Sequence, residues 1–194
     1  AALPLQERQL AAAREILRML RCQVAEGKIP RDRLGQAIFE RWGKLDVLVN
    51  NAGICPFVPI MEMKPETWQK VLDVNLTGAF TCTQLVGQHM IERGEGGRVV
   101  FITSLATSLT QAAQVDYAAS KAGLEMAMAG FATALGPHGI TCNAVLPGWV
   151  RTDMGGANAH RSIDEGVSGI LWAALLPDNG PTGGYFRDGK PLSW

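Results

Sequence analysis

The amino-acid sequence predicts an α/β domain in which helices cover both faces of a doubly wound parallel sheet. Short, almost wholly apolar segments predict strands that are buried on both faces. Between them lie longer segments with apolar residues at helical spacing. This alternation of strand and helix is typical of a parallel sheet with helices on both faces. With 194 residues, the chain has the length of one such domain, 1–194.

The first predicted element is a helix over 5–19, rich in strong helix formers, and a short apolar strand over Met19–Val24 follows it. Pro30 and Asp32 open a second helix, which Gly43 ends. Further strands are predicted at Leu45–Val49, Arg98–Thr103, Ile140–Leu146 and Gly183–Arg187. The helices between them are predicted at 65–93, at 117–135 and from Ser162 to about Leu176. Ser162 and Glu165 predict a capping box at the start of the last helix.

The composition is that of an ordinary globular protein, with 47% apolar and 19% charged residues. Eighteen basic and eighteen acidic residues give no net charge, which argues against a nucleic-acid or anionic-membrane binder. No apolar run approaches the roughly 18 to 20 residues that cross a bilayer, and the first ten residues do not form a signal peptide. Four scattered cysteines, without metal-ligand or CxxC spacing, predict reduced thiols in a cytoplasmic protein and no metal site: Cys22, Cys55, Cys82 and Cys142.

Three polar or glycine-containing segments follow three of the predicted strands. They are Asn50-Asn51-Ala52-Gly53, Ser104, and the segment Pro147-Gly148-Trp149-Val150-Arg151-Thr152. In a parallel sheet the carboxyl ends of the strands lie at one edge, and ligands bind there. Small residues such as Gly53 also let the backbone come close to a ligand.

Tyr117 and Lys121 lie four residues apart and share one face of a predicted helix. A tyrosine with its ordinary pKa of about 10 is a poor acid or base at neutral pH. A nearby ammonium ion favours the phenolate, so Lys121 is expected to lower the pKa of Tyr117. Ser104 could face the phenol, and Asn75 lies inside the predicted long helix. Each feature alone is common by chance, but their order and shared sheet edge predict a site.

The combination of NNAG (50–53), Asn75, Ser104, YAASK (117–121) and PGWVRT (147–152) resembles the short-chain dehydrogenase/reductase family over roughly residues 20–194. The resemblance implies a Rossmann-like fold and hydride transfer between NAD or NADP and an alcohol or carbonyl. It also implies that Tyr117 is the acid/base, that Lys121 lowers its pKa and contacts the nicotinamide ribose, that Ser104 binds the substrate oxygen, and that Asn75 supports a proton-relay water. Cofactor contacts are implied for Asn51, Ala52, Gly53, Pro147, Gly148, Val150 and Thr152.

The family's glycine-rich phosphate-binding signature, TGxxxGxG, does not occur in this sequence. The sequence therefore predicts that a βαβ unit of roughly 30 residues is lacking at the N-terminus, and it does not indicate a preference for NAD or NADP. Three explanations stay open. The sequence omits residues of the full protein, as the missing initial Met suggests; Met19–Val24 pairs with Leu45–Val49 instead; or the chain is a relative that binds no dinucleotide.

Two local resemblances indicate different small-molecule substrates. The segments at 51–57 and 142–148 resemble sugar dehydrogenases of the family that oxidise aldoses such as rhamnose, whereas 180–191 resembles the tail of carbonyl reductases. Trp149 is expected to line the pocket, with a place in the core as the alternative. Family members are commonly dimers or tetramers, which implies an interface on the helices at 65–93 and 117–135. The rival hypothesis is a non-catalytic scaffold that cannot hold a cofactor.

Overall fold

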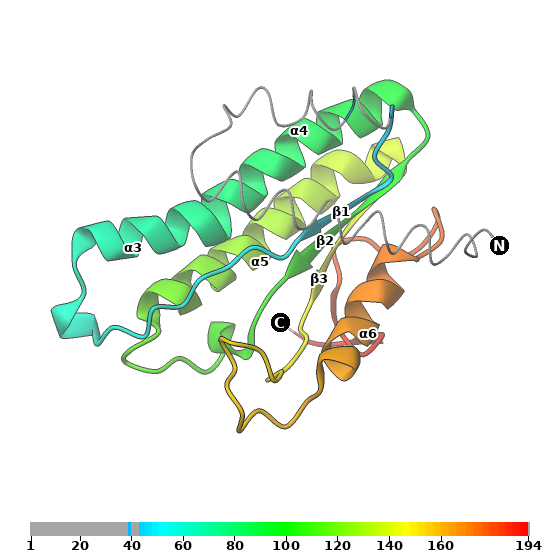
Figure 1. The fold of residues 1–194 in the computed structure, drawn as a ribbon. Coiled ribbons are helices and arrows are strands. Elements are labelled where there is room, and N and C mark those ends of the chain that lie inside the picture. Colours follow the sequence, from blue (N-terminus) through cyan, green and yellow to red (C-terminus); the bar gives the residue numbers. More distant parts are fainter. Residues whose placement is uncertain (1–38, 40–42, 194) are drawn as a thin grey trace.

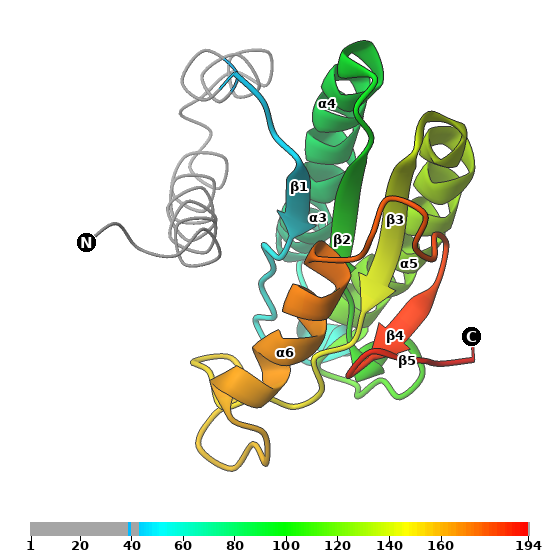
Figure 2. The ribbon, with the colours of Figure 1, turned by 90° about the vertical axis from the view of Figure 1, so that its right-hand side faces the viewer.

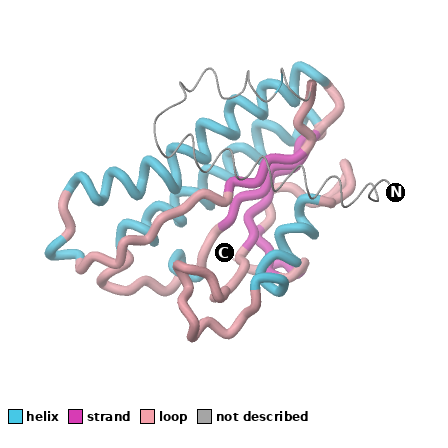
Figure 3. The backbone as a smooth tube through the Cα atoms, viewed as in Figure 1, coloured by secondary structure: helices cyan, strands magenta, loops and turns pink. Residues whose placement is uncertain are grey.

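The computed structural model describes Phe39 and residues 43–193. Within these residues a five-stranded sheet has the order β1-β2-β3-β4-β5. Four of its strands run parallel: β1 (Val47–Asn50), β2 (Gly97–Ile102), β3 (Ile140–Val145) and β4 (Tyr185–Arg187). The fifth, β5 (Lys190–Pro191), pairs antiparallel with β4. Figure 3 shows the strands as a layer between helices, which is the Rossmann-like arrangement predicted from the sequence.

Helices cover both faces of this sheet. On one side lie α3 (Pro65–Leu72), α4 (Gly78–Arg93) and α5 (Val115–Leu135), and on the other lies α6 (Ile163–Ala174), as Figures 1 and 2 show. Alternate residues of β2 explain why helices pack on both faces of the sheet. Val99 and Phe101 belong to the core cluster under α4 and α5, whereas Val100 and Ile102 belong to the cluster under α6. Both faces of the strand therefore need apolar side chains.

β1 is less deeply buried than the sequence predicts. Leu48 and Asn50 are buried, but Val47 and Val49 on the other face are only half-buried. In the described part of the chain β1 is the end strand of the sheet, where α6 covers it only partly. β5 was not predicted, because a pair of residues that includes a proline gives almost no strand signal.

The predicted long helix over 65–93 is interrupted by a π-helical segment, η2 (Asp73–Thr77). The Gly78 amide donates to the Asp73 carbonyl, five residues back, instead of four. Single π turns are often found at functional sites, and this one contains Asn75, whose side chain is fully buried.

The structure contains two of the helix ends that the sequence predicts. Ser162 and Glu165 form the expected capping box: the Glu165 amide donates to Ser162 Oγ at 3.2 Å, and the Ser162 amide donates to Glu165 Oε2 at 2.6 Å. Gly43 has a φ of 73° and its amide donates to the Phe39 carbonyl at 2.8 Å, as expected of a residue that ends a helix. The predicted helix over 5–19 and strand over Met19–Val24 lie outside the described residues.

Candidate active site

The segments predicted to form a site do meet at one edge of the sheet. β1, β2 and β3 are parallel, so Asn51–Gly53, Ser104 and Pro147–Thr152 all follow carboxyl ends of neighbouring strands. The first turns of α5, with Tyr117 and Lys121, begin after the loop that leaves β2.

Lys121 is deeply buried at this edge, with a relative exposure of 3%. Its Nζ donates to the Ile102 carbonyl at the end of β2, at 2.7 Å, and lies 5.8 Å from the centre of the Tyr117 ring. Burial penalises the ammonium ion and lowers the pKa of Lys121 to about 8, against a smaller opposing effect of the Glu125 carboxylate. A lysine in this state can gain or lose a proton near neutral pH.

The pKa of Tyr117 is raised, not lowered as the sequence predicts. Burial is the largest cause, because it disfavours the phenolate. A hydrogen bond with the Ser104 side chain opposes this shift, and the nearby Cys55 adds to it. Lys121 donates to the Ile102 carbonyl, and it is not among the groups that shift the pKa of Tyr117.

Ser104 joins the loop after β2 to Tyr117. It is the N-cap of the short 3-10 helix η3 (Leu105–Thr107), and its Oγ accepts a hydrogen bond from the Ala106 amide at 3.2 Å. This cap fixes the serine hydroxyl beside the phenol. The predicted pairing of these two side chains is therefore present.

Asn75, in η2, connects α5 to the loop after β1. Its Oδ1 accepts from the Ile54 amide at 2.8 Å, and its Nδ2 donates to the Ile54 carbonyl at 3.0 Å and to Ser120 Oγ at 2.9 Å. Gly53 fits beneath it: a Cβ added there would lie 3.6 Å from both Asn75 Oδ1 and Lys121 Nζ. Gly53 thus marks the point where Asn75 and Lys121 come together.

The segment after β3 forms a compact loop. Gly148 has a φ of 83°, and a Cβ there would lie 2.7 Å from Arg161 Cδ, so glycine is required by both conformation and space. Trp149 is 47% exposed and donates from its indole nitrogen to the Gly155 carbonyl at 2.8 Å. The alternative that Trp149 belongs to the core is therefore wrong.

Several groups near this edge were not singled out from the sequence. Cys55 is half-buried beside Tyr117, and Glu125 is buried one helical turn after Lys121. The four-residue spacing from Lys121 could have indicated Glu125. The described residues contain no group of three His, Cys, Asp or Glu side chains able to hold a metal ion. None of the helices described here is long and apolar enough to span a membrane.

Comparison with known proteins identifies the family. The short chain dehydrogenase model matches residues 7–162, which is most of the chain. The chain belongs to the short-chain dehydrogenase family. L-rhamnose 1-dehydrogenase (NAD(P)(+)) of Azotobacter vinelandii is 44% identical to it over 123 residues, 63% of this chain and 48% of the relative. 3-Oxoacyl-[acyl-carrier-protein] reductase of Synechocystis is 42% identical to it over 123 residues, which are 63% of this chain and 49% of that relative. The chain thus spans about half the length of these curated relatives.

A solved structure supports the fold of this short-chain dehydrogenase. Gluconate 5-dehydrogenase from Burkholderia cenocepacia, determined in complex with NADP and tartrate, superposes with a TM-score of 0.72 and 28% sequence identity. The alignment covers 82% of this chain and 69% of that one.

A Lys121→Met variant of this family member tests the buried ammonium ion. The pKa of Lys121 is about 8 in the folded state against 10.5 for an ordinary lysine, so the unfolded chain binds more protons between these values. The contribution of Lys121 to the stability of the wild type therefore rises with pH across that window, and the variant lacks this rise. We expect the free energy of unfolding of wild type relative to variant to increase by about 1 kcal/mol from pH 7 to pH 9.

Urea unfolding at several pH values measures this difference. Lys64→Met is the matched control, because Lys64 is exposed, and its curve should run parallel to that of the wild type. A Lys121→Met curve that is also parallel would show that the ammonium ion is not destabilised by burial.

Proposed function

We propose that the protein is an NAD(P)-dependent oxidoreductase that catalyses hydride transfer between the nicotinamide and a small alcohol or carbonyl substrate. The observation that carries the proposal is the convergence of Ser104, Tyr117, Lys121 and Asn75 at the carboxyl edge of the sheet. The family membership and the NAD(P)(+) in the name of the rhamnose-oxidising relative support it.

In this proposal Tyr117 is the general acid and base. Because burial raises its pKa, the phenol is protonated at neutral pH and can donate to the carbonyl oxygen of a substrate during reduction. The Ser104 hydroxyl, which is hydrogen-bonded with the phenol, would bind the same oxygen. In the oxidative direction the phenol oxygen takes the proton back, which a charged Lys121 favours.

The residues at this edge fit a dinucleotide, whose two halves would lie on different segments. Gly53 leaves open the space where a Cβ would lie 3.6 Å from Lys121 Nζ and from Asn75 Oδ1. Lys121 and Tyr117 would hold the ribose, and the adenosine side would lie along Asn51, Ala52 and Gly53. Pro147, Gly148, Val150 and Thr152 would hold the nicotinamide. When bound, the dinucleotide supplies or accepts the hydride, and the chain's own residues orient the substrate and move the proton.

Titration with NADH and with NADPH, followed by nicotinamide fluorescence, tests the proposal. Saturable binding by wild type, weakened in Lys121→Met and retained in Lys64→Met, is the expected result. An absence of saturable binding to the 194-residue chain would overturn the proposal and favour the non-catalytic scaffold.

The substrate is proposed to be a sugar or another small carbonyl compound. Relatives named as acting on L-rhamnose, and similar structures named as acetoin and gluconate dehydrogenases, define a short panel. Turnover of L-rhamnose alone would support the sugar-dehydrogenase resemblance of 51–57. Turnover of acetoin alone would support the carbonyl-reductase resemblance of 180–191.

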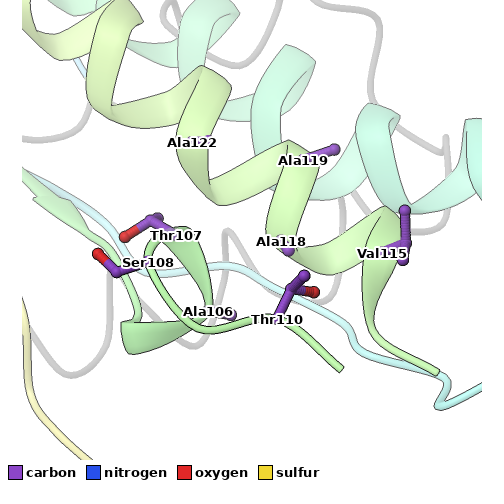
Figure 4. Close-up of a pocket in the computed structure, with 8 residues that line it drawn as sticks. All are labelled: Ala106, Thr107, Ser108, Thr110, Val115, Ala118, Ala119 and Ala122. Carbon is purple, nitrogen blue, oxygen red and sulfur yellow. The ribbon is translucent and has the colours of Figure 1, made fainter. Parts of the chain in front are cut away.

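We also propose that the protein forms a homodimer or homotetramer through the outer face of α5. α5 is apolar around most of its circumference, and Ala122 and Met126 are exposed one turn apart. A helix that is apolar all round is normally covered. Beside it a groove of about 300 Å³ separates α5 from the loop at η3, as Figure 4 shows; it is lined by Ala106, Thr107, Ser108, Thr110, Val115, Ala118, Ala119 and Ala122. Phe80 of α4 is 45% exposed and contacts Phe131 of α5.

Met126→Glu is expected to convert the oligomer into monomers, because it places a charge on this face without altering the core. Met126 is 70% exposed, and the control, Met61→Glu, changes a methionine that is 92% exposed in η1 (Ile60–Glu62). Sedimentation velocity measures the mass of each. A monomeric wild type would contradict the proposed oligomer. An oligomeric Met126→Glu variant would show that the interface does not include this face of α5.

A further inference from the structure

The loop that follows β3 is closed at its base by Arg161, which lies just before the N-cap of α6. Val150 and Arg161 form an isolated parallel β-bridge. The Arg161 amide donates to the Trp149 carbonyl at 3.1 Å, and the Arg151 amide donates to the Arg161 carbonyl at 2.9 Å. Arg161 therefore fixes, through its backbone, the part of the loop that also contains Gly148.

The side chain of Arg161 ties this closure to two other elements. Its Nη1 and Nη2 donate to Asp188 Oδ2 at 2.8 Å and to Asp188 Oδ1 at 2.6 Å, a bidentate pair. Nη2 also donates to the Glu165 carbonyl in the first turn of α6, at 2.7 Å. The Arg161 side chain is only 12% exposed, and its Cδ lies against Gly148. A bidentate guanidinium with such packing holds a defined geometry.

Asp188 lies in the turn between β4 and β5. Arg187 pairs with Lys190, so Asp188 and Gly189 form a two-residue hairpin loop, with φ values of 52° and 74°. Both residues thus have the left-handed conformation of a type I′ turn, for which Asp-Gly is a preferred sequence. The Arg161 guanidinium lowers the pKa of the Asp188 carboxyl, so the pair is charged across the neutral range.

We propose that Arg161 and Asp188 form a latch that positions the loop at 147–152 for the nicotinamide end of the cofactor. This inference rests on the proposed function, in which Gly148, Val150 and Thr152 hold that end. Arg161 and Asp188 are positioning residues: the hairpin turn holds the guanidinium, and the guanidinium supports Gly148 and the β-bridge at Val150. The short hairpin near the C-terminus thereby acts on cofactor affinity from outside the site.

Hydrogen–deuterium exchange on the protein without cofactor tests the latch. Asp188→Asn removes the charge and keeps a residue that tolerates the left-handed turn. We expect the amides of Arg151, Gly155, Gly156 and Arg161 to exchange about fivefold faster, as for loss of a partly exposed charged pair. Arg161→Lys should restore part of the protection lost in Arg161→Gln.

Asp178→Asn is the matched control. Asp178 accepts from Arg98 Nη2 at 2.6 Å, so it also belongs to an arginine–aspartate pair next to α6, but at the other end of that helix. Its exchange in 149–161 should equal that of the wild type. Equal exchange of the amides in 149–161 in Asp188→Asn and Asp178→Asn would contradict the proposal that the Arg161–Asp188 pair positions the loop.

Cofactor titration separates the latch from the proposed function. If wild type binds NADPH, the Asp188→Asn variant should bind it about fivefold more weakly and show a higher KM for the dinucleotide with little change in kcat. Arg161→Gln/Asp188→Asn should bind it no more weakly than the worse single variant, because the two residues act as one unit. If wild type binds no dinucleotide, the proposed function fails, whereas faster exchange would still establish that the pair orders the loop.

Discussion

Tyr117→Phe is expected to reduce the rate of hydride transfer by roughly 10²- to 10⁴-fold, the usual contribution of a positioned general acid or base. The substitution removes only the phenolic hydroxyl, which is hydrogen-bonded with Ser104 and has a raised pKa. The aromatic ring keeps its packing at the start of α5. Measurement of kcat with the best substrate of the panel, together with thermal unfolding, separates a chemical loss from a folding defect.

The second tyrosine of the chain provides the control for this variant. Tyr185 of β4 is 8% exposed, and its hydroxyl has hydrogen-bonding neighbours in Thr103 and Thr107. Tyr185→Phe deletes the same group at a different buried position, and it should lower stability while leaving kcat within a few-fold of wild type. If Tyr117→Phe kept near-normal turnover, Tyr117 would not be the acid/base.

The parallel sheet could be predicted from the sequence because its signals are local. In Arg98–Thr103 an unbroken apolar run indicates burial on both faces, and the structure explains the run: Val99 and Val100 face opposite clusters. Ser162 and Glu165 were also readable, since a capping box depends on residues three apart. β5 gave too short a signal, although the Asp188-Gly189 pair is a known hairpin signal that could have indicated it.

The site could be predicted from the sequence where its residues follow the ends of strands. Gly53 and Ser104 could be assigned to one edge, because parallel strands place their carboxyl ends together. The bond between Arg161 and Asp188 could not be read, since the two residues are 27 positions apart and meet only through tertiary structure. The prediction that the pKa of Tyr117 is lowered was wrong for a similar reason, because desolvation depends on everything packed around the ring.

Asn75→Ala is expected to have the largest effect on stability among the single substitutions considered. It leaves the Ile54 amide and carbonyl and the Ser120 hydroxyl without the partner that the Asn75 side chain supplies. Each buried polar group left unpaired costs roughly 1 to 3 kcal/mol, and water entering the space would reduce the sum. We expect the free energy of unfolding to fall by about 3 kcal/mol, as measured by urea denaturation.

Gln69→Ala is the matched control, because Gln69 of α3 is exposed and its amide donates to Asp73 Oδ1 at 2.9 Å. Its free energy of unfolding should stay within about 0.5 kcal/mol of wild type. The Asn75→Ala variant should also lose dinucleotide binding, because Gly53 is held near Lys121 by the loop that Asn75 bonds. A variant that kept wild-type stability would mean that these hydrogen bonds do not fix the loop. A stable variant with weakened binding would assign Asn75 to the cofactor side of the site instead.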